Sequence, residues 1–145
     1  MPMNRLEYKK LGLTYTVTQT FTAGIELLGF EVKSLKTGLG SLDGSKVIVR
    51  GGEAYAVGIY IPPFQPANTP AGYDNNRTRR LLLTKDEIRE LSHLEQTKGL
   101  TIIPSVVYTH NNLIKCEIAV CKKKQASDKR ESIKQEISRR ELRAH

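Results

Sequence analysis

Three closely spaced arginines are the first residues in this sequence that could do chemistry. Arg77, Arg79 and Arg80 stand in the segment NNRTRRLLL. A helix is expected to start just after them, at Thr84. Guanidinium groups bind phosphate oxygens through paired N–H donors, and the N-terminus of a helix also favours phosphate. The pattern therefore predicts phosphate contact. The alternative is ordinary surface arginines ahead of a buried leucine run, residues 81–83.

The segment GFEVKSLKTG is a second candidate. A strand expected over residues 25–35 would place Glu31 and Lys33 on one face and Phe30 and Val32 on the other. The charged face would suit an RNA contact. It would equally suit the solvated face of an edge strand, and the residue pattern leaves both interpretations open.

The third candidate is the C-terminal tail, residues 122–145. It holds nine Lys or Arg against four Asp or Glu, starts with the cluster Lys122–Lys124, and buries too little apolar surface to fold alone. We expect a disordered segment that becomes helical when bound, because Ile133 and Ile137 would share a helix face. The alternative is a solvated tail that only aids solubility.

The charge indicates a polyanionic partner. The chain has 145 residues and a formal net charge of +8. The tail contributes +5 (nine minus four), and residues 1–121 contribute +3 (fourteen Lys or Arg minus eleven Asp or Glu). Such a balance favours nucleic acid or an acidic membrane surface. No segment is apolar enough to span a membrane, and no secretory signal is found, so we expect no membrane partner.

The residues that usually support catalysis or metal binding are scattered. Cys116 and Cys121 are an odd number of residues apart in an expected strand, which puts them on opposite faces and argues against a disulfide between them. This fits a reducing cytoplasm. The cysteines and the three histidines have no zinc spacing, and there is no phosphate-binding P-loop or nucleophile–base pair. We expect no metal, no cofactor and no enzyme activity.

The elements that must position these residues are mostly strands. Strands are expected at 15–21, 25–35, 47–49, 55–61, 100–108 and 113–121, with a tight hairpin at Gly51-Gly52 and a polar turn at 110–112. Thr84 and Glu87 form a capping-box pattern that starts a helix ending near Gly99. The prediction is a mainly β fold, an OB-type antiparallel β-barrel with an embedded helix, over 1–121, followed by the tail.

Several ordered blocks resemble one known family. AGIELLGFEVKSLKTG, RTRRLLLTKDEI, DKRESIK and, more weakly, GLTIIP are similar to blocks of small protein B (SmpB), the SsrA-binding or tmRNA-binding protein family. The resemblance extends over nearly the whole chain from about residue 15. It implies an OB-type barrel that binds the tRNA-like domain of tmRNA and delivers it to stalled ribosomes for trans-translation.

The resemblance also implies how the parts are used. The tail would enter the empty mRNA channel at the decoding region of the small ribosomal subunit and become helical there. The protein would act as a cytoplasmic monomer and catalyse no reaction. The RNA-binding residues it implies are Glu31, Val32, Lys33, Arg77, Arg79, Arg80, Leu82, Thr84, Lys122, Lys123 and Lys124. The ribosome-contacting tail residues it implies are Asp128, Lys129, Arg130, Ile133, Lys134 and Arg139.

The chain departs from the family pattern at a few positions. Tyr8 and Thr22 stand where the family usually has Asn and Glu, and Lys123 stands where it usually has Gly. Ser127 replaces an aromatic or His side chain that could stack on a base.

Three alternatives remain open. A general OB-fold binder of single-stranded RNA would present aromatic side chains for stacking, but the nine Phe and Tyr and the absence of Trp argue against it, because most stand at core-like positions. A structural ribosomal protein would use the same basic tail. An RNA-processing enzyme would need an acid–base or metal cluster, and none is evident.

Overall fold

One antiparallel sheet organises the protein. The computed structural model describes residues 5–65, 67 and 69–124, and within them seven strands hydrogen-bond in the order β1-β6-β7-β2-β5-β4-β3. The strands are β1 (Arg5–Glu7), β2 (Tyr15–Ile25), β3 (Lys46–Arg50), β4 (Glu53–Val57), β5 (Arg79–Leu82), β6 (Leu100–His110) and β7 (Leu113–Lys123).

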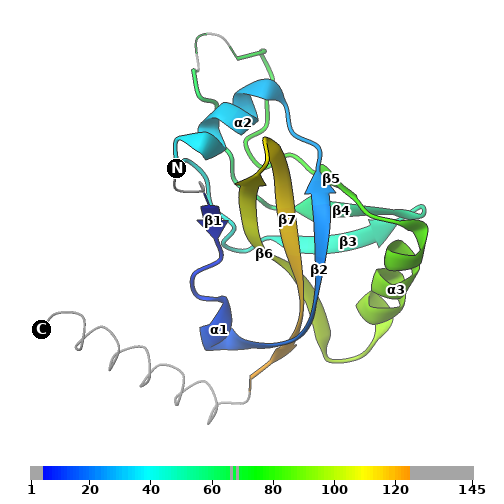
Figure 1. Ribbon diagram of the computed structural model, residues 1–145. Helices are drawn as coiled ribbons and strands as arrows, with labels where there is room; N and C mark the ends of the chain where they lie inside the picture. The colour runs from blue at the N-terminus through cyan, green and yellow to red at the C-terminus, as the bar shows by residue number, and fades with distance from the viewer. Residues whose placement is uncertain (1–4, 66, 68, 125–145) are drawn as a thin grey trace, which may run out of the picture.

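The sheet curls on itself. In Figure 1 the long strands β2, β6 and β7 cross β3 and β4 at a large angle. The edge strand β3 contacts β6, which is not its hydrogen-bonded neighbour, so the two ends of the strand order approach each other. Bulges in β2, between Val17 and Gln19, and in β6, between Pro104 and Val106, accompany this bending. The predicted mainly β antiparallel fold is confirmed.

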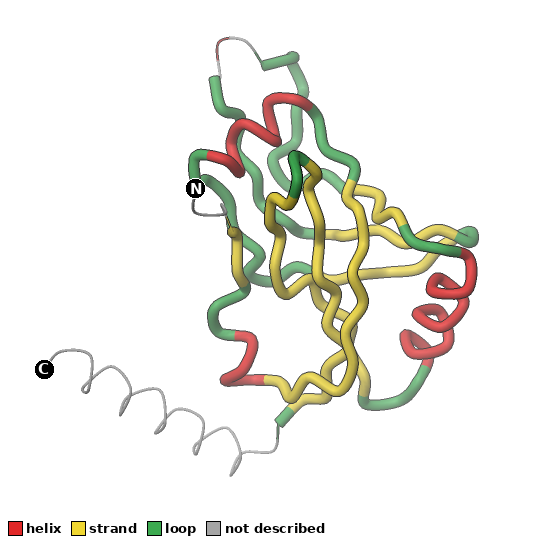
Figure 2. Tube along the Cα trace, in the orientation of Figure 1, coloured by secondary structure: helices red, strands yellow, loops and turns green. Residues whose placement is uncertain are grey.

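Three helices lie around the sheet in the described part of the chain (Figure 2). They are α1 (Leu11–Thr14), α2 (Gly29–Lys36) and α3 (Lys85–Gln96). Figure 1 shows α2 beyond one end of the long strands and α1 at the other, while α3 lies beside the tip of β3. None of these helices has the length and apolar character needed to cross a lipid bilayer.

The predicted strand over 25–35 is wrong, because β2 ends at Ile25 and α2 starts at Gly29. The buried residues of this segment are Glu31, Ser34 and Leu35, which recur at helical rather than strand spacing. The Glu31 carboxylate accepts a hydrogen bond from the Leu28 backbone N–H, which would otherwise be unpaired at the helix start. The alternation seen in the sequence therefore does not describe two faces of a strand.

The turn predictions are confirmed. Gly51 and Gly52 both have positive φ angles, 59° and 77°, and join β3 to β4 in a two-residue hairpin. Asn111 and Asn112 have φ angles of 49° and 63° and join β6 to β7 in the same way. The short strands β1 and β5 were not expected from the sequence, because each is stabilised by pairing with strands far along the chain.

Two apolar clusters pack on opposite sides of β7. Cys116 belongs to the main core with Leu42, Ile59 and Ile118, and Cys121 packs in a smaller cluster with Leu11. Both thiols are free and buried, which confirms the prediction of opposite faces. Burial raises the pKa of Cys116 to about 12 and that of Cys121 to about 11, so neither is a reactive thiolate at neutral pH.

The start of α3 has the capping box that the sequence predicts. The Thr84 hydroxyl accepts a hydrogen bond from the Glu87 backbone N–H at 3.2 Å, and the Glu87 carboxylate accepts one from the Thr84 N–H at 3.0 Å. Ile88 and Leu91 on the same helix are buried against the core. The cap thus fixes the point where β5 leaves the sheet and α3 begins.

We expect Thr84→Ala to lower the free energy of unfolding by about 1 kcal/mol, because the variant loses one half of the capping box. Thr84→Ser, which keeps the hydroxyl, should cost less. Urea unfolding checks both. Thr97→Ala at the other end of α3 removes only a hydroxyl bond to the His93 carbonyl and serves as the control. Equal losses at the two ends would contradict the role given to the cap.

Candidate nucleic-acid interface

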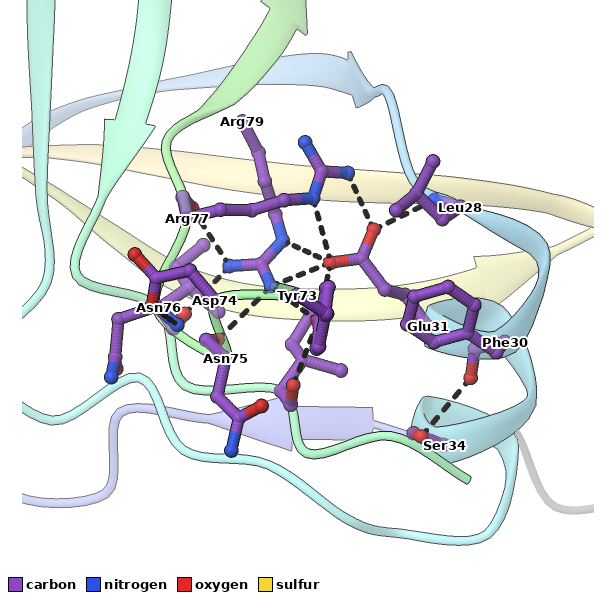
Figure 3. Close-up of polar contacts among 12 residues, drawn as sticks. Leu28, Phe30, Glu31, Ser34, Tyr73, Asp74, Asn75, Asn76, Arg77 and Arg79 are labelled. Carbon is purple, nitrogen blue, oxygen red and sulfur yellow. Dashed lines mark hydrogen bonds and ion pairs between the residues drawn. The ribbon is translucent and has the colours of Figure 1, made fainter. Parts of the chain in front are cut away.

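A buried carboxylate binds two arginines at the junction of α2, β5 and the loop before it. The Glu31 side chain is fully buried, and Figure 3 shows the guanidiniums of Arg77 and Arg79 both directed at it. Arg77 donates from Nη2 to Oε1 and from Nε to Oε2, the latter at 3.1 Å. Arg79 donates from Nε and Nη2 to Oε2 at 2.8 and 2.6 Å. Glu31, Tyr73, Arg77 and Arg79 are called the Glu31 cluster below.

Arg79 has no donor left for another partner. Its side chain is fully buried. Besides Glu31, it donates to the Ile59 carbonyl at 2.6 Å, and to the Arg77 and Asn75 carbonyls, both at 3.1 Å. The three carbonyls come from the two ends of the connection between β4 and β5, and Glu31 comes from α2, so one guanidinium closes the long loop and ties it to α2.

Tyr73 completes the cluster from the same loop. Its hydroxyl lies 2.8 Å from both Glu31 Oε2 and the Ile61 carbonyl. Burial raises the pKa of Tyr73 to about 12, and the hydrogen bond to Glu31 adds to the shift, so the hydroxyl stays protonated. The ring packs edge-on against Phe30 of α2, with centroids 4.7 Å apart. Tyr73 therefore ties the loop to α2 by both polar and apolar contacts.

The charges of the cluster do not cancel. Burial alone would raise the pKa of Glu31, but the hydrogen bonds from Arg77, the Leu28 backbone, Tyr73 and Arg79 outweigh it and hold the pKa below its ordinary value. One carboxylate thus faces two guanidiniums, leaving one positive charge in excess. Both carboxylate oxygens of Glu31 accept hydrogen bonds within the cluster. The cluster therefore holds α2, the loop and β5 in place and has no role in proton transfer.

A groove lies beside the cluster. It has a volume of about 400 Å³ and runs between α2, the end of β2, β5 and the β6–β7 hairpin. Leu82 and Leu113 line it and are 45% and 57% exposed, far more than core leucines. Leu82 lies directly over Gly24, where an added Cβ would come within 3.2 Å of Leu82 Cβ. The groove is lined by Gly24, Ile25, Leu27, Val32, Leu82, Asn112, Leu113, Ile114 and Lys115 and is called the apolar groove below.

Cationic side chains stand at both ends of this surface. Lys115 lines the apolar groove itself. A second open hollow of about 490 Å³ shares Ile25 and Leu27 with the groove and is lined on its far side by Arg77. The Arg77 side chain is 29% exposed, so its outer edge faces solvent while its inner edge binds Glu31. An apolar floor between two cations suits an unstacked base and its flanking phosphates.

A second cationic surface lies at the opposite end of β2 and β7. Lys122 and Lys123 pair there with Thr16 and Tyr15, and Lys122 also pairs with Leu100 at the start of β6. The Lys124 backbone N–H donates to the Thr14 carbonyl of α1 at 2.8 Å. These pairings bring the end of β7, the start of β6 and the end of α1 together, and exposed lysines lie on β7 or just before α1 and β6 in the sequence. The set, called the lysine end below, is Lys9, Lys10, Lys98, Lys122 and Lys123.

The structure separates the candidate residues into distinct places. Val32 and Leu82 line the apolar groove, Lys33 is exposed on α2, and Thr84 caps α3. Glu31 is buried in its cluster rather than lying on a strand face. Lys122 and Lys123 belong to β7, which runs past the expected body boundary at residue 121. Asp128, Lys129, Arg130, Ile133, Lys134 and Arg139 lie outside the described residues.

Arg79 and Arg80 differ from the arginine pattern expected of a phosphate site. Arg79 points inward and is saturated by Glu31 and carbonyls, so this arrangement gives it a positioning role and no phosphate contact. Arg80 is exposed on the outer face of β5, but its guanidinium is bound to Glu53 and Glu26. Alternation along β5 could have signalled the difference, since adjacent residues of a strand face opposite sides.

Sequence reasoning missed Lys115, Leu113 and Tyr73. Lys115 and Leu113 join the site because the register of β2 with β7 sets Lys115 opposite Gly24. Tyr73 lies in the long loop, where the sequence carries no periodic signal. Among the described residues, no group of three or more His, Cys, Asp or Glu side chains is placed to hold a metal ion.

Comparison with known proteins gives a consistent family. A model of the family described as SmpB protein matches residues 6–145. The SsrA-binding protein of Persephonella marina is 45% identical over 128 residues, covering 88% of this chain and 84% of that protein. The SsrA-binding protein of Chromohalobacter salexigens is 38% identical over 141 residues, covering 94% of this chain and 90% of that protein.

A solved structure has the same fold. It is described as "tmRNA-SmpB: a journey to the center of the bacterial ribosome" and superposes with a TM-score of 0.73 at 34% sequence identity. The superposition covers 90% of this chain and 94% of the other.

The Glu31 cluster makes a testable contribution to stability. We expect Glu31→Gln to lower the free energy of unfolding by about 3–5 kcal/mol at neutral pH, because it leaves the excess buried positive charge uncompensated. The carboxylate has a lower pKa folded than unfolded, so its contribution is complete above the ordinary value of 4.5 and is lost as pH falls through the lower folded value.

Urea unfolding at about pH 7 and about pH 3 checks both statements. The difference between wild type and variant should shrink at the acidic pH, because protonation favours the unfolded chain once the pH is below the ordinary Glu pKa of 4.5 and the folded pKa is lower still. Glu26→Gln, an exposed carboxylate in the same region, is the control and should change stability by about 0.5 kcal/mol or less. A pH-independent difference would contradict the assignment of charge to Glu31.

Proposed function

The chain belongs to the SmpB protein family, and on that premise we propose that it binds tmRNA and carries it to stalled ribosomes for trans-translation. The single observation that supports this most directly is the apolar groove with Lys115 inside it and Arg77 beyond it. Such a surface favours RNA with splayed bases over a regular duplex, because a duplex hides its base faces.

The groove binds the tRNA-like domain of tmRNA in this proposal. Leu82 and Leu113 offer apolar contact to base faces, and the Asn112 amide can hydrogen-bond to a base edge. Lys115 and the outer edge of Arg77 meet the flanking phosphates. Lys33 on the exposed side of α2 adds a further cation beside Val32.

The Glu31 cluster supports this surface from beneath. It joins α2, which carries Val32, to the segment that carries Arg77 and leads into Leu82. Ser34 adds a second link from α2, since its hydroxyl lies 2.6 Å from the Pro62 carbonyl. The walls of the groove are therefore set before RNA arrives, which lowers the ordering cost of binding.

The lysine end meets a second polyanion, which we propose is ribosomal RNA. From Tyr15 to Gly24, β2 covers nine residue steps, about 30 Å, so the two cationic surfaces are too far apart for one phosphate group. Lys9, Lys10 and Lys98 are additions to the sequence prediction of Lys122–Lys124. The tail, residues 122–145, starts at this end and would continue into the mRNA channel.

The proposed role is binding and delivery, with no reaction of its own. The chain would act as a monomer in the cytoplasm, where tmRNA and ribosomes are found. The division into a barrel, 1–121, and a tail, 122–145, is part of the same proposal: the barrel recognises tmRNA and the tail acts on the ribosome.

The first test measures binding to the tRNA-like domain of tmRNA and to bulk tRNA at two salt concentrations. We expect the full chain and a version cut after Lys124 to prefer tmRNA equally, because the groove is intact in both. Only the full chain should support trans-translation in a reconstituted system. Equal, steeply salt-dependent binding to every RNA would contradict the proposal.

The second test separates the apolar and cationic parts of the groove. Leu82→Ala should weaken tmRNA binding by about tenfold, the loss of one buried apolar contact of about 1.4 kcal/mol, with an unchanged salt slope. Lys115→Ala should weaken binding and lower the salt slope by about 0.7–0.9, the effect of one phosphate contact. Leu39→Ala, at a leucine 41% exposed and outside the groove lining, is the control. Loss of affinity in all three variants would place recognition elsewhere.

A further inference from the structure

Arg80 is the exposed arginine of β5, yet carboxylates surround it. Its Nε and Nη2 donate to the two oxygens of Glu53 at 3.0 and 3.4 Å. Its Nη1 donates to Glu26 Oε1 at 3.1 Å. All three guanidinium nitrogens are thus engaged by acids, and the group of Glu26, Glu53 and Arg80 carries one net negative charge.

The backbone fixes this arrangement. Arg80 pairs with Tyr55 across the β4–β5 ladder, so Glu53, two residues earlier on β4, is its diagonal neighbour. The Glu26 backbone N–H donates to the Arg80 carbonyl at 3.0 Å, which brings the Glu26 side chain to the same place. The hydrogen bonds and charge of Glu53, with a smaller contribution from Glu26, raise the pKa of Arg80.

The acidic group borders the proposed RNA surface. Arg80 and Leu82 alternate with buried residues on β5 and therefore share its outer face, about 7 Å apart along the strand. Glu26 lines the hollow that also holds Arg77. RNA in the apolar groove would have Glu26 in the adjoining hollow and Glu53, bound to Arg80, on the same face of β5 as Leu82. The surface is negative there although the chain as a whole is basic.

We propose that Glu53 and Glu26 are specificity-determining residues, which prevent Arg80 from acting as a general phosphate site. This inference rests on the proposed function. Glu53 and Glu26 take three of the five N–H donors of Arg80, so a phosphate that approaches this guanidinium meets two carboxylates that repel it. RNA that presents only its phosphate backbone therefore gains little binding energy at Arg80.

RNA with the correct shape meets the same residues differently. Carboxylates accept hydrogen bonds from base amino groups and from 2′-hydroxyls. An RNA seated in the apolar groove can present such donors to Glu53 and Glu26 instead of a phosphate. The same two residues thus disfavour unmatched RNA and tolerate the matched one, so that discrimination comes from a repulsive element as well as from attractive contacts.

The test compares Glu53→Gln with wild type for binding to the tRNA-like domain of tmRNA and to bulk tRNA. We expect the affinity for bulk tRNA to rise about two- to fivefold, with a salt slope steeper by about 0.7–0.9, because Arg80 gains a phosphate. Affinity for the tmRNA domain should rise less or fall, so the preference for tmRNA narrows. Glu26→Gln should act in the same direction, more weakly, since it makes one hydrogen bond where Glu53 makes two.

Two controls isolate the cause. Glu7→Gln removes the same charge from β1, at the other edge of the sheet, and likewise frees a paired arginine, Arg5. It should leave the preference unchanged. In the double variant Glu53→Gln with Arg80→Ala, the gain for bulk tRNA should disappear, because the inference requires Arg80 to be the group released.

Each other outcome overturns the inference. Equal tightening of both RNAs, matched by Glu7→Gln, would mean an effect of net charge only. An unchanged preference in Glu53→Gln, or a gain that survives without Arg80, would remove these residues from recognition. If the wild-type protein itself shows no preference for tmRNA, the proposed function fails, whatever the variants do.

Discussion

The arrangement of this protein depends on one buried ionised carboxylate. Glu31 has no contact with water and is stabilised only because two guanidiniums, a tyrosine hydroxyl and a backbone N–H supply its hydrogen bonds. An unpaired charge in that place would be very costly, so the partners are held as firmly as the acid itself. The four groups come from the start of α2, the long loop and β5, and their mutual requirement fixes these segments relative to one another.

The cluster also explains how a loop with little regular structure holds Arg77 at the edge of the proposed RNA surface. Between β4 and β5 the chain contains six prolines or glycines and few buried apolar side chains to order it. Arg79 replaces that missing apolar packing by binding the carbonyls of Ile59, Arg77 and Asn75. At this end of the barrel the buried contacts are therefore polar, while the exposed groove beside them is lined by the apolar side chains of Leu82 and Leu113.

Features set by neighbouring residues, such as turns and helix caps, could be predicted from the sequence. Features set by contacts between distant residues could not. The Gly51-Gly52 hairpin, the asparagine turn before β7 and the Thr84 cap are set within four residues, and all three were predicted correctly. Glu31 meets Arg77 and Arg79 across 46 and 48 residues, and no local pattern reports such a pairing. The segment of α2 therefore looked like an alternating strand, and Arg79 looked like a surface arginine. The family blocks pointed to Glu31, Arg77 and Arg79 as candidates, and the geometry then separated residues that support the proposed surface from residues that line it.

The long hydrogen-bonded pairing of β2 with β7 sets the distance between the two cationic surfaces, and this distance can change only in fixed steps. Inserting a single residue in either strand would turn every following side chain to the opposite face, so the spacing can change only in pairs of residues or through a bulge. Bulges already occur in β2 and in β6. The barrel therefore holds its two cationic surfaces at a fixed separation. RNA partners that use both surfaces must match this separation, because the strand register does not let it adjust.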